Sequence, residues 1–266
     1  MINSKHRKAQ EDPATQMPVP SRRTPAGNTA TGWLKVLALV FMFIDHAGKV
    51  LFSNMQEMRV LGRIAFPLYV WCMIVGFFYT RCVWKYMLRV LVTGLVSQPL
   101  YVVALNHQWN EPNIFLTLLL GLCALWGIRE NKYGSRIWAP AIALALATVL
   151  GANYGWKGVL LFILLYAVQE SRAGIAAVMV AYFLFWGASY SVTRSLFGIS
   201  INLNALPAFL SGPLSSFLRM ETYALLSLPL ILIPFRKDLK MPRWLGYALY
   251  PAHLALLIGL KALMGV

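Results

Sequence analysis

The sequence predicts an all-α protein: a polytopic membrane helix bundle with about nine transmembrane helices. Three observations lead to this prediction. Of the 266 residues, 59% are hydrophobic and only 12% are charged, whereas a soluble domain has about 25% charged residues. The mean hydropathy is +0.61. The apolar residues also form runs of membrane length, with lysines and arginines gathered between them.

Residues 1–32 are rich in charge, proline, serine and threonine, and they lack the apolar core of a cleavable signal peptide. We expect a disordered, basic cytoplasmic tail here, followed by a single transmembrane domain over 33–266. The net charge of +15 lies in short loops and not in one contiguous patch. It therefore indicates membrane topology, and we expect no nucleic-acid partner.

Each crossing needs about 20 apolar residues, and runs of suitable composition predict spans at about 33–52, 64–80, 86–105, 113–128, 137–153, 156–169, 174–190, 221–235 and 244–262. Asparagine, proline, glycine and serine residues interrupt the stretch 191–220. We expect that stretch to be re-entrant or interfacial and not to cross.

The basic loops set the expected orientation. Loops 81–89 and 129–136 carry lysine and arginine, whereas loop 106–112 carries neither, so the first two are expected in the cytoplasm and the third outside. The basic loop 236–243 is cytoplasmic only if 191–220 does not cross. We therefore expect a multi-pass protein of the bacterial inner membrane with a cytoplasmic N-terminus and bilayer lipid around it.

Two ionisable residues, Asp45 and His46, interrupt the first predicted span. An acidic side chain at the centre of a membrane helix costs roughly 2.5–3.5 kcal/mol, so a partner or a function is expected. Lys49 lies one turn further along the helix and is one candidate partner for the aspartate. Arg63, which enters the second predicted span, is another.

Consecutive helical residues point about 100° apart, so Asp45 cannot orient the His46 ring unless the helix breaks after it. A group from another span is the alternative. A structural histidine and a functional one remain equally open from the residues alone, although intramembrane ionisable groups are functional hypotheses by default.

Further polar residues lie within or at the ends of the apolar runs. Arg59 precedes Arg63 by four residues and is explained by snorkelling to the membrane surface. Gln98 precedes Pro99, where a kink favours a packing role over a substrate contact.

Asn113 follows a turn and is expected to cap a helix. Tyr250 and His253 flank Pro251 in the last span. Cys72, Cys82 and Cys123 have no metal-ligand spacing, so we expect neither a metal site nor disulfides.

Six motifs, in this order, resemble the TraX family of inner-membrane proteins, which are encoded by conjugative plasmids and N-acetylate the pilin subunit. They are LKVLALVFMFIDHAGKVLF, RVLGRIAFPLYVW, SQP, NIFLTLLLGL, YGWKGVLLF and YPAHL. The likeness covers about residues 33 to 262. The sequence is also similar, more loosely, to membrane acyltransferases that have a histidine in the first span.

The resemblance implies an acetyl-CoA-dependent acyltransferase that acts on the N-terminus of a conjugative pilin during pilus maturation. It makes His46 the catalytic base, with Asp45 beside it. Because acetyl-CoA is cytoplasmic and a processed pilin presents its N-terminus toward the outer leaflet, the site must be reached from both sides.

Arg63 and Gln98 become candidates to stabilise the oxyanion. On the same basis we assign substrate contacts to Asn113, Tyr250 and His253. The phosphates of CoA are assigned to the basic loop residues Arg81, Lys85 and Arg89, although topology explains their charge equally well.

Other functions remain open at this stage. The same site would serve an O-acyltransferase acting on a glycan or lipid hydroxyl. Buried charges are also typical of transporters, and a non-catalytic protein that assembles with other conjugative transfer proteins is the remaining alternative.

Overall fold

The computed structural model describes residues 24–52, 54–193 and 195–265 of the chain. This part is mostly helical, and its helices are α1 (Thr31–Val50), α2 (Gln56–Gly62), α3 (Ala65–Tyr79), α4 (Val83–Leu105), α5 (Ile114–Glu130), α6 (Ser135–Val149), α7 (Gly155–Val168), α8 (Arg172–Gly187), α9 (Ala208–Phe217), α10 (Leu228–Leu232) and α11 (Arg243–Met264). Two 3-10 segments, η2 (Leu203–Ala205) and η3 (Met220–Ser227), complete the helical elements. The one antiparallel pair of strands described, β1 (Ser195–Leu196) with β2 (Ile199–Ser200), forms a short hairpin. The prediction of an all-α fold is otherwise right.

Three helical segments of the described chain are long and apolar enough to cross a membrane: Gln56–Tyr79, Val83–Leu105 and Trp244–Met264. Shorter apolar helices occupy Ser135–Val149, Gly155–Val168, Arg172–Gly187 and Met220–Leu232. A helix of 15 residues, such as α6, spans roughly 22 Å, less than the hydrocarbon thickness of about 30 Å. The figure of about nine crossings is therefore not confirmed and stays a prediction.

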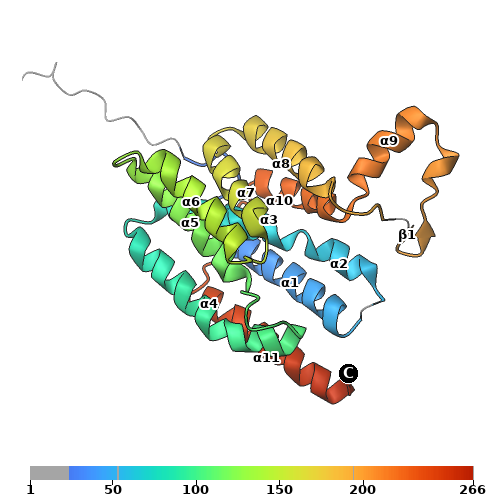
Figure 1. Cartoon of the computed structure of the whole chain (residues 1–266), viewed down its shortest axis with the longest axis horizontal. Helices are drawn as coiled ribbons and strands as arrows, with labels where there is room; N and C mark the ends of the chain where they lie inside the picture. The colour runs from blue at the N-terminus through green and yellow to red at the C-terminus, as the bar shows by residue number, and fades with distance from the viewer. Residues whose placement is uncertain (1–23, 53, 194, 266) are drawn as a thin grey trace, which may run out of the picture.

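Helix α3 forms the centre of the bundle (Figure 1). It is apolar on nearly all sides, and its Trp71 and Phe77 side chains are fully buried. A helix without a polar face is stable only when other elements surround it. Helices α1, α5, α7 and α10 and segment η3 all contact α3, which meets that requirement.

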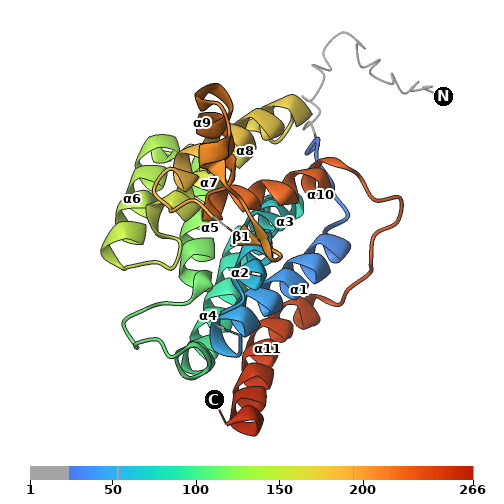
Figure 2. The same cartoon turned by 90° about the vertical axis from the view of Figure 1, so that its right-hand side faces the viewer.

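The remaining helices form two groups around this centre (Figure 2). Helices α5, α6 and α7 pack against one another, as consecutive helices joined by short loops usually do. Helix α11 returns from the far end of the chain and packs against α4 and α1. The first and last helices of the chain are therefore neighbours, and this contact builds part of the site.

The segment before α1 packs against the bundle. The indole Nε1 of Trp71 donates to the Asn28 carbonyl over 2.8 Å. The Asn28 N–H donates to the Ile231 carbonyl, and the Ala26 N–H to that of Gln169. The predicted disordered tail of 1–32 is thus wrong for residues 26–32, because buried hydrogen bonds fix them. Its first 23 residues lie outside the described chain.

Apart from residue 194, the stretch 191–220 contains the β1–β2 hairpin, η2 and the ten-residue helix α9. Figure 1 shows α9 and the hairpin extending from one side of the bundle. Among the described residues, no helix of membrane length lies in this stretch. This agrees with its prediction as a segment that does not cross, while a re-entrant or interfacial position stays a prediction.

Candidate functional site

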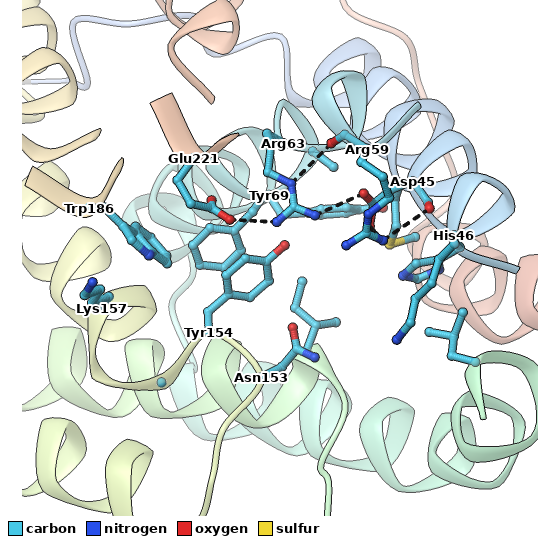
Figure 3. Close-up of a pocket in the computed structure, with 18 of the residues that line it drawn as sticks. Asp45, His46, Arg59, Arg63, Tyr69, Asn153, Tyr154, Lys157, Trp186 and Glu221 are labelled. Carbon is cyan, nitrogen blue, oxygen red and sulfur yellow. Dashed lines mark hydrogen bonds and ion pairs between the residues drawn. The ribbon is translucent and has the colours of Figure 1, made fainter. Parts of the chain in front are cut away.

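A cavity of about 570 Å³ opens beside the C-terminal half of α1. Its lining combines titratable and aromatic side chains, as Figure 3 shows. The charged, imidazole and aromatic residues among them are Asp45, His46, Lys49, Arg59, Arg63, Phe66, Tyr69, Tyr101, His107, Tyr154, Trp156, Lys157, Trp186, Tyr190, Glu221 and Tyr250. A concave site with convergent polar groups is the usual place for binding or catalysis.

Helix α1 brings Asp45 and His46 to this cavity, and α2 can approach it closely because two glycines lie between them. A Cβ atom at Gly62 would overlap the side chain of Asp45. At Gly48 a Cβ atom would lie 2.6 Å from the Cβ of Met58. Without side chains at these two positions, Arg59 on α2 and Arg63 directly after it come within reach of the aspartate.

Four charged side chains form a continuous network, with Arg63 at its centre (Figure 3). Arg63 donates from Nη1 to Glu221 Oε1 over 2.8 Å and from Nη2 to Asp45 Oδ1 over 3.1 Å. Its Nε donates to the carbonyl of Arg59 over 3.3 Å. Arg59 in turn donates from Nη1 to Asp45 Oδ2 over 3.3 Å.

This network balances two arginines against two carboxylates. The Glu221 and Arg63 side chains are only 5% and 11% exposed. Isolated charges are costly at such burial, and hydrogen-bonded ion pairs offset part of the cost. Three of the five N–H donors of Arg63 are engaged, so the guanidinium is fixed in place and retains donors for a ligand.

The His46 ring meets a second histidine. Its Nδ1 lies 2.9 Å from Nε2 of His253 on α11, and the two rings stack with centroids 5.1 Å apart. Nδ1 of His253 lies 3.4 Å from the Leu249 carbonyl oxygen. Since a carbonyl can only accept, this Nδ1 carries the hydrogen and Nε2 of a neutral His253 accepts.

The same reasoning fixes the tautomer of His46. If His253 Nε2 accepts, His46 Nδ1 must donate, and the lone pair of a neutral His46 ring lies on Nε2. The Leu249 carbonyl, the His253 ring and the His46 ring thus form a hydrogen-bonded chain. This chain leaves Nε2 of His46 as an unprotonated ring nitrogen at the cavity. This chemistry suits proton abstraction from a bound group.

Several sequence predictions are settled by these contacts. Arg63 pairs with Asp45 as one alternative proposed, and the helix continues unbroken through Val50, so the partner of His46 comes from another helix. Arg59 pairs with Asp45, so snorkelling alone does not explain it.

The proposed pairing of Lys49 with Asp45 is wrong. Lys49 Nζ lies 2.6 Å from Nε2 of His107, while the Asp45 carboxylate accepts from Arg59 and Arg63. His107 Nδ1 lies 2.5 Å from Glu111 Oε2. The Gln108 N–H and the His107 ring hold the pKa of the exposed Glu111 carboxyl below its usual value. The three side chains Lys49, His107 and Glu111 thus form a polar chain at the cavity's edge.

Two predicted site residues, Gln98 and Asn113, form hydrogen bonds at the end of loop 106–112 and do not line the cavity. Gln98 Nε2 donates to the Glu111 carbonyl, and its Oε1 accepts from the Asn113 N–H over 3.0 Å. Asn113 Oδ1 accepts from the Phe115 N–H, which confirms the helix cap. These bonds agree with the packing interpretation of Gln98, and neither residue lines the cavity.

The other predicted residues divide in the same way. Tyr250 lines the cavity, while His253 is only 7% exposed and reaches it through His46. Arg81, Lys85 and Arg89 are exposed side chains that line neither this cavity nor the one described below. Among the described residues, no group of three or more histidine, cysteine or acidic side chains is arranged to hold a metal ion.

Sequence reasoning missed Glu221, Tyr154 and Lys157. Glu221 lies in the first turn of η3, and the available signal was a lone acid at the start of an apolar run. Tyr154 stacks on Phe66 with ring centroids 3.8 Å apart, and burial raises its pKa. Its turn was interpreted as structural, since aromatic residues beside a tight turn are common at membrane surfaces.

The chain is similar to known proteins over most of its length. The family model described as "TraX protein" matches residues 30–261. This chain belongs to the TraX family. The matched range contains the whole charge network, both stacked histidines and the polar chain at the cavity's edge.

Two relatives of this TraX family member have curated names. The "Probable fimbrial assembly protein FimC, serogroup H1" of Dichelobacter nodosus is 29% identical over 249 residues, covering 86% of this chain and 94% of that protein. The "Uncharacterized protein RP591" of Rickettsia prowazekii (strain Madrid E) is 35% identical over 99 residues, which span 37% of each chain. No solved structure matches significantly.

Proposed function

We propose that this chain is a multi-pass N-acetyltransferase of the bacterial inner membrane. It transfers acetyl from acetyl-CoA to the N-terminus of a pilin subunit. Three findings support the proposal: membership of the TraX family, a relative named as a probable fimbrial assembly protein, and helices able to span a membrane. The observation that carries the chemistry is the His46–His253 pair at the cavity wall.

The reaction follows from the groups in the cavity. An α-amino group has a pKa of about 7.7–8.0 and is mostly protonated at neutral pH, so it must lose a proton to attack. The ammonium group first loses one proton to solvent, and Nε2 of His46 then accepts a second proton from the nitrogen as the neutral amine attacks. The nitrogen forms a bond to the acetyl carbon, the carbon–sulfur bond breaks, and the proton finally passes to the thiolate of CoA.

Arg63 and Arg59 supply the matching electrostatics. As the acetyl carbonyl becomes tetrahedral, negative charge develops on its oxygen. Donors held in advance, in a site of restricted solvent access, stabilise that charge strongly. The carboxylates of Asp45 and Glu221 hold the Arg63 fork on both sides, so these two residues act by positioning the donor.

The test is the intact mass of the pilin from cells that carry wild-type protein, His46→Ala or no protein. We expect the wild type to add one acetyl group, and His46→Ala to lose about 10²–10⁴-fold in rate, the usual contribution of a general base. Asp45→Asn is expected to reduce the rate and retain part of it.

A pilin mass that does not depend on this chain contradicts the proposal. Normal acetylation by a stably accumulated His46→Ala protein contradicts the role of the imidazole. An acetyl group found instead on a glycan or lipid would assign the same site to a hydroxyl acceptor.

A further inference from the structure

A second cavity, of about 450 Å³, lies beside the N-terminal half of α1. It extends between α1, α3, α4, α5 and the start of α11, where most of its lining is apolar or aromatic. The lining residues that matter here are Thr31, Lys35, Leu39, Tyr86, Lys240 and Gly246. Nothing in the charge network or the stacked histidine pair belongs to it.

The two cavities share a wall. Met42, Tyr69, Ile114 and Tyr250 line both of them, so these side chains lie between the two spaces. Met42 and Tyr250 are almost completely buried. His46 lies one helical turn beyond Met42, on the same side of α1, and it lines only the first cavity.

Positive charge lies at the other end of the second cavity. Lys35 and Lys240 line it, and Arg236 and Lys237 belong to the same loop between α10 and α11 as Lys240. Asp238 also lines this cavity, and its Oδ1 accepts from the Gly32 and Leu239 N–H groups. Among the described residues, no carboxylate forms an ion pair with either lining lysine.

We propose that this second cavity binds the acyl donor, a phosphate-bearing acyl thioester, with its phosphates at Lys35 and Lys240 and its narrow arm reaching the shared wall. The inference rests on the proposed acetyl transfer, and it assigns the donor to this loop and not to Arg81, Lys85 and Arg89. The acceptor amine occupies the first cavity, beside His46.

This arrangement gives each reactant its own opening. The thioester carbonyl reaches the wall from the side of Lys35, and the amine reaches it from the side of the His46 ring. When the wall side chains move aside, the nitrogen bonds to the acyl carbon and the carbon–sulfur bond breaks. The amine proton goes to His46 Nε2 and then to the departing thiolate, which leaves as a thiol through the second cavity. Met42 has flexible side-chain torsions suited to such a gate.

A phospholipid would also fit an apolar space with lysines at its mouth. The thioester is favoured because the inner end of this cavity is the wall that it shares with the first cavity, where His46 lies. A donor must reach that wall to react, whereas a bound phospholipid would not have to.

The experiment measures the affinity of the purified full-length protein for CoA in detergent, independently of acetyl transfer. Gly246→Leu fills the cavity, since the nearest atom to a new Cβ there is 3.8 Å away on Met241. Gly259→Leu is the matched control, because it lies in the same helix with open space around it and lines neither cavity. We expect Gly246→Leu to abolish CoA binding and the control to retain it.

A second pair of variants keeps the cavity shape. Lys240→Glu is expected to weaken CoA binding by at least about tenfold, the effect of losing one charge-assisted hydrogen bond. Lys237→Glu, in the same loop but not lining the cavity, should change it much less. His46→Ala should bind CoA as wild type does.

The two proposals fail in different ways. Wild type that acetylates pilin while all variants keep wild-type affinity for CoA overturns this inference and leaves the function intact. Wild type that binds CoA in the predicted manner but acetylates no pilin overturns the proposed acceptor alone. A wild type that does not bind CoA overturns the inference, as does a co-purified phospholipid that Gly246→Leu specifically loses.

Discussion

Glu221 shows how a single side chain determines the position of the cavity's main donor. It is almost fully buried and bonds to one end of the Arg63 guanidinium, while Asp45 bonds to the other. Removing one partner from a buried ion pair leaves an uncompensated charge. The energetic importance of Glu221 therefore exceeds that of most acidic residues in the chain.

Glu221→Gln is expected to lower the free energy of unfolding by about 3–5 kcal/mol, the usual effect of breaking a buried pair from one side. Thermal unfolding in detergent measures the change. The control is Glu130→Gln, which removes an exposed pair with Lys132 at 3.7 Å and should cost about 0–1 kcal/mol. Equal effects of the two substitutions would mean that Asp45 alone is a sufficient partner for the buried Arg63 guanidinium.

The second residue-scale prediction concerns the tautomer of His46. His253→Phe keeps the ring stacking but removes the acceptor for His46 Nδ1–H, so acetylation should fall while the protein accumulates normally. His253→Gln retains an acceptor oxygen and should recover part of the rate. Equal rates for the two variants would show that His253 only fills space.

The residues of the site could be predicted only in part. Asp45, His46, Arg63 and Tyr250 are signalled by their cost or polarity in apolar runs, and all four line the cavity. Whether His253 meets His46 depends on the packing of α11 against α1, and one sequence contains no record of such long-range contacts. Glu221 was overlooked for the same reason.

At the scale of elements, the close approach of α1 and α2 depends on the missing side chain of Gly62. Gly62→Ala introduces a Cβ that would overlap Asp45, and overpacking of this kind typically costs about 1–3 kcal/mol. We expect a lower unfolding temperature and a lower acetylation rate, since the carboxylate must move away from the arginines.

Gly259→Ala is the matched control for this substitution. Its surroundings are open, and alanine in a helix interior is favoured over glycine by about 1 kcal/mol. Unfolding temperature should therefore stay constant or rise in the control. A Gly62→Ala protein as stable and active as wild type would disprove the role of the close approach.

Local sequence signals predicted most elements and failed where the backbone bonds to distant partners. The Asn113 cap and the helices on either side of loop 106–112 follow from neighbouring residues. The segment around Asn28 does not, because its bonds are to the carbonyl of Ile231 and the indole of Trp71. Composition alone therefore placed it in a disordered tail.

At the scale of the whole molecule, charge asymmetry predicts the orientation in the membrane. Cys82 is exposed and caps the N-terminus of α4, the end of that helix that we expect in the cytoplasm, whereas loop 106–112 is expected outside. The expected loop 81–89 is wrong beyond Cys82, because α4 already begins at Val83. A membrane-impermeant maleimide should label Trp109→Cys in intact spheroplasts. It should label the wild-type protein only after permeabilisation, at a site that Cys82→Ser removes.

Labelling of wild-type Cys82 in intact spheroplasts would reverse this orientation. The second cavity, which we propose as the donor site, would then open away from the cytoplasmic pool of acetyl-CoA. The number of crossings is less constrained by sequence, because an apolar run of 15 residues looks the same in a short buried helix and in a span that neighbouring helices shield.

The stacked histidines join the first helix of the chain to the last. His253 follows His46 by 207 residues. During synthesis α1 therefore leaves the ribosome long before its partner histidine is translated. A nascent chain that stalls before α11 would thus hold a base without a defined tautomer. Under the proposed mechanism, a chain that ends before α11 would lack the His253 acceptor and would not catalyse acetyl transfer.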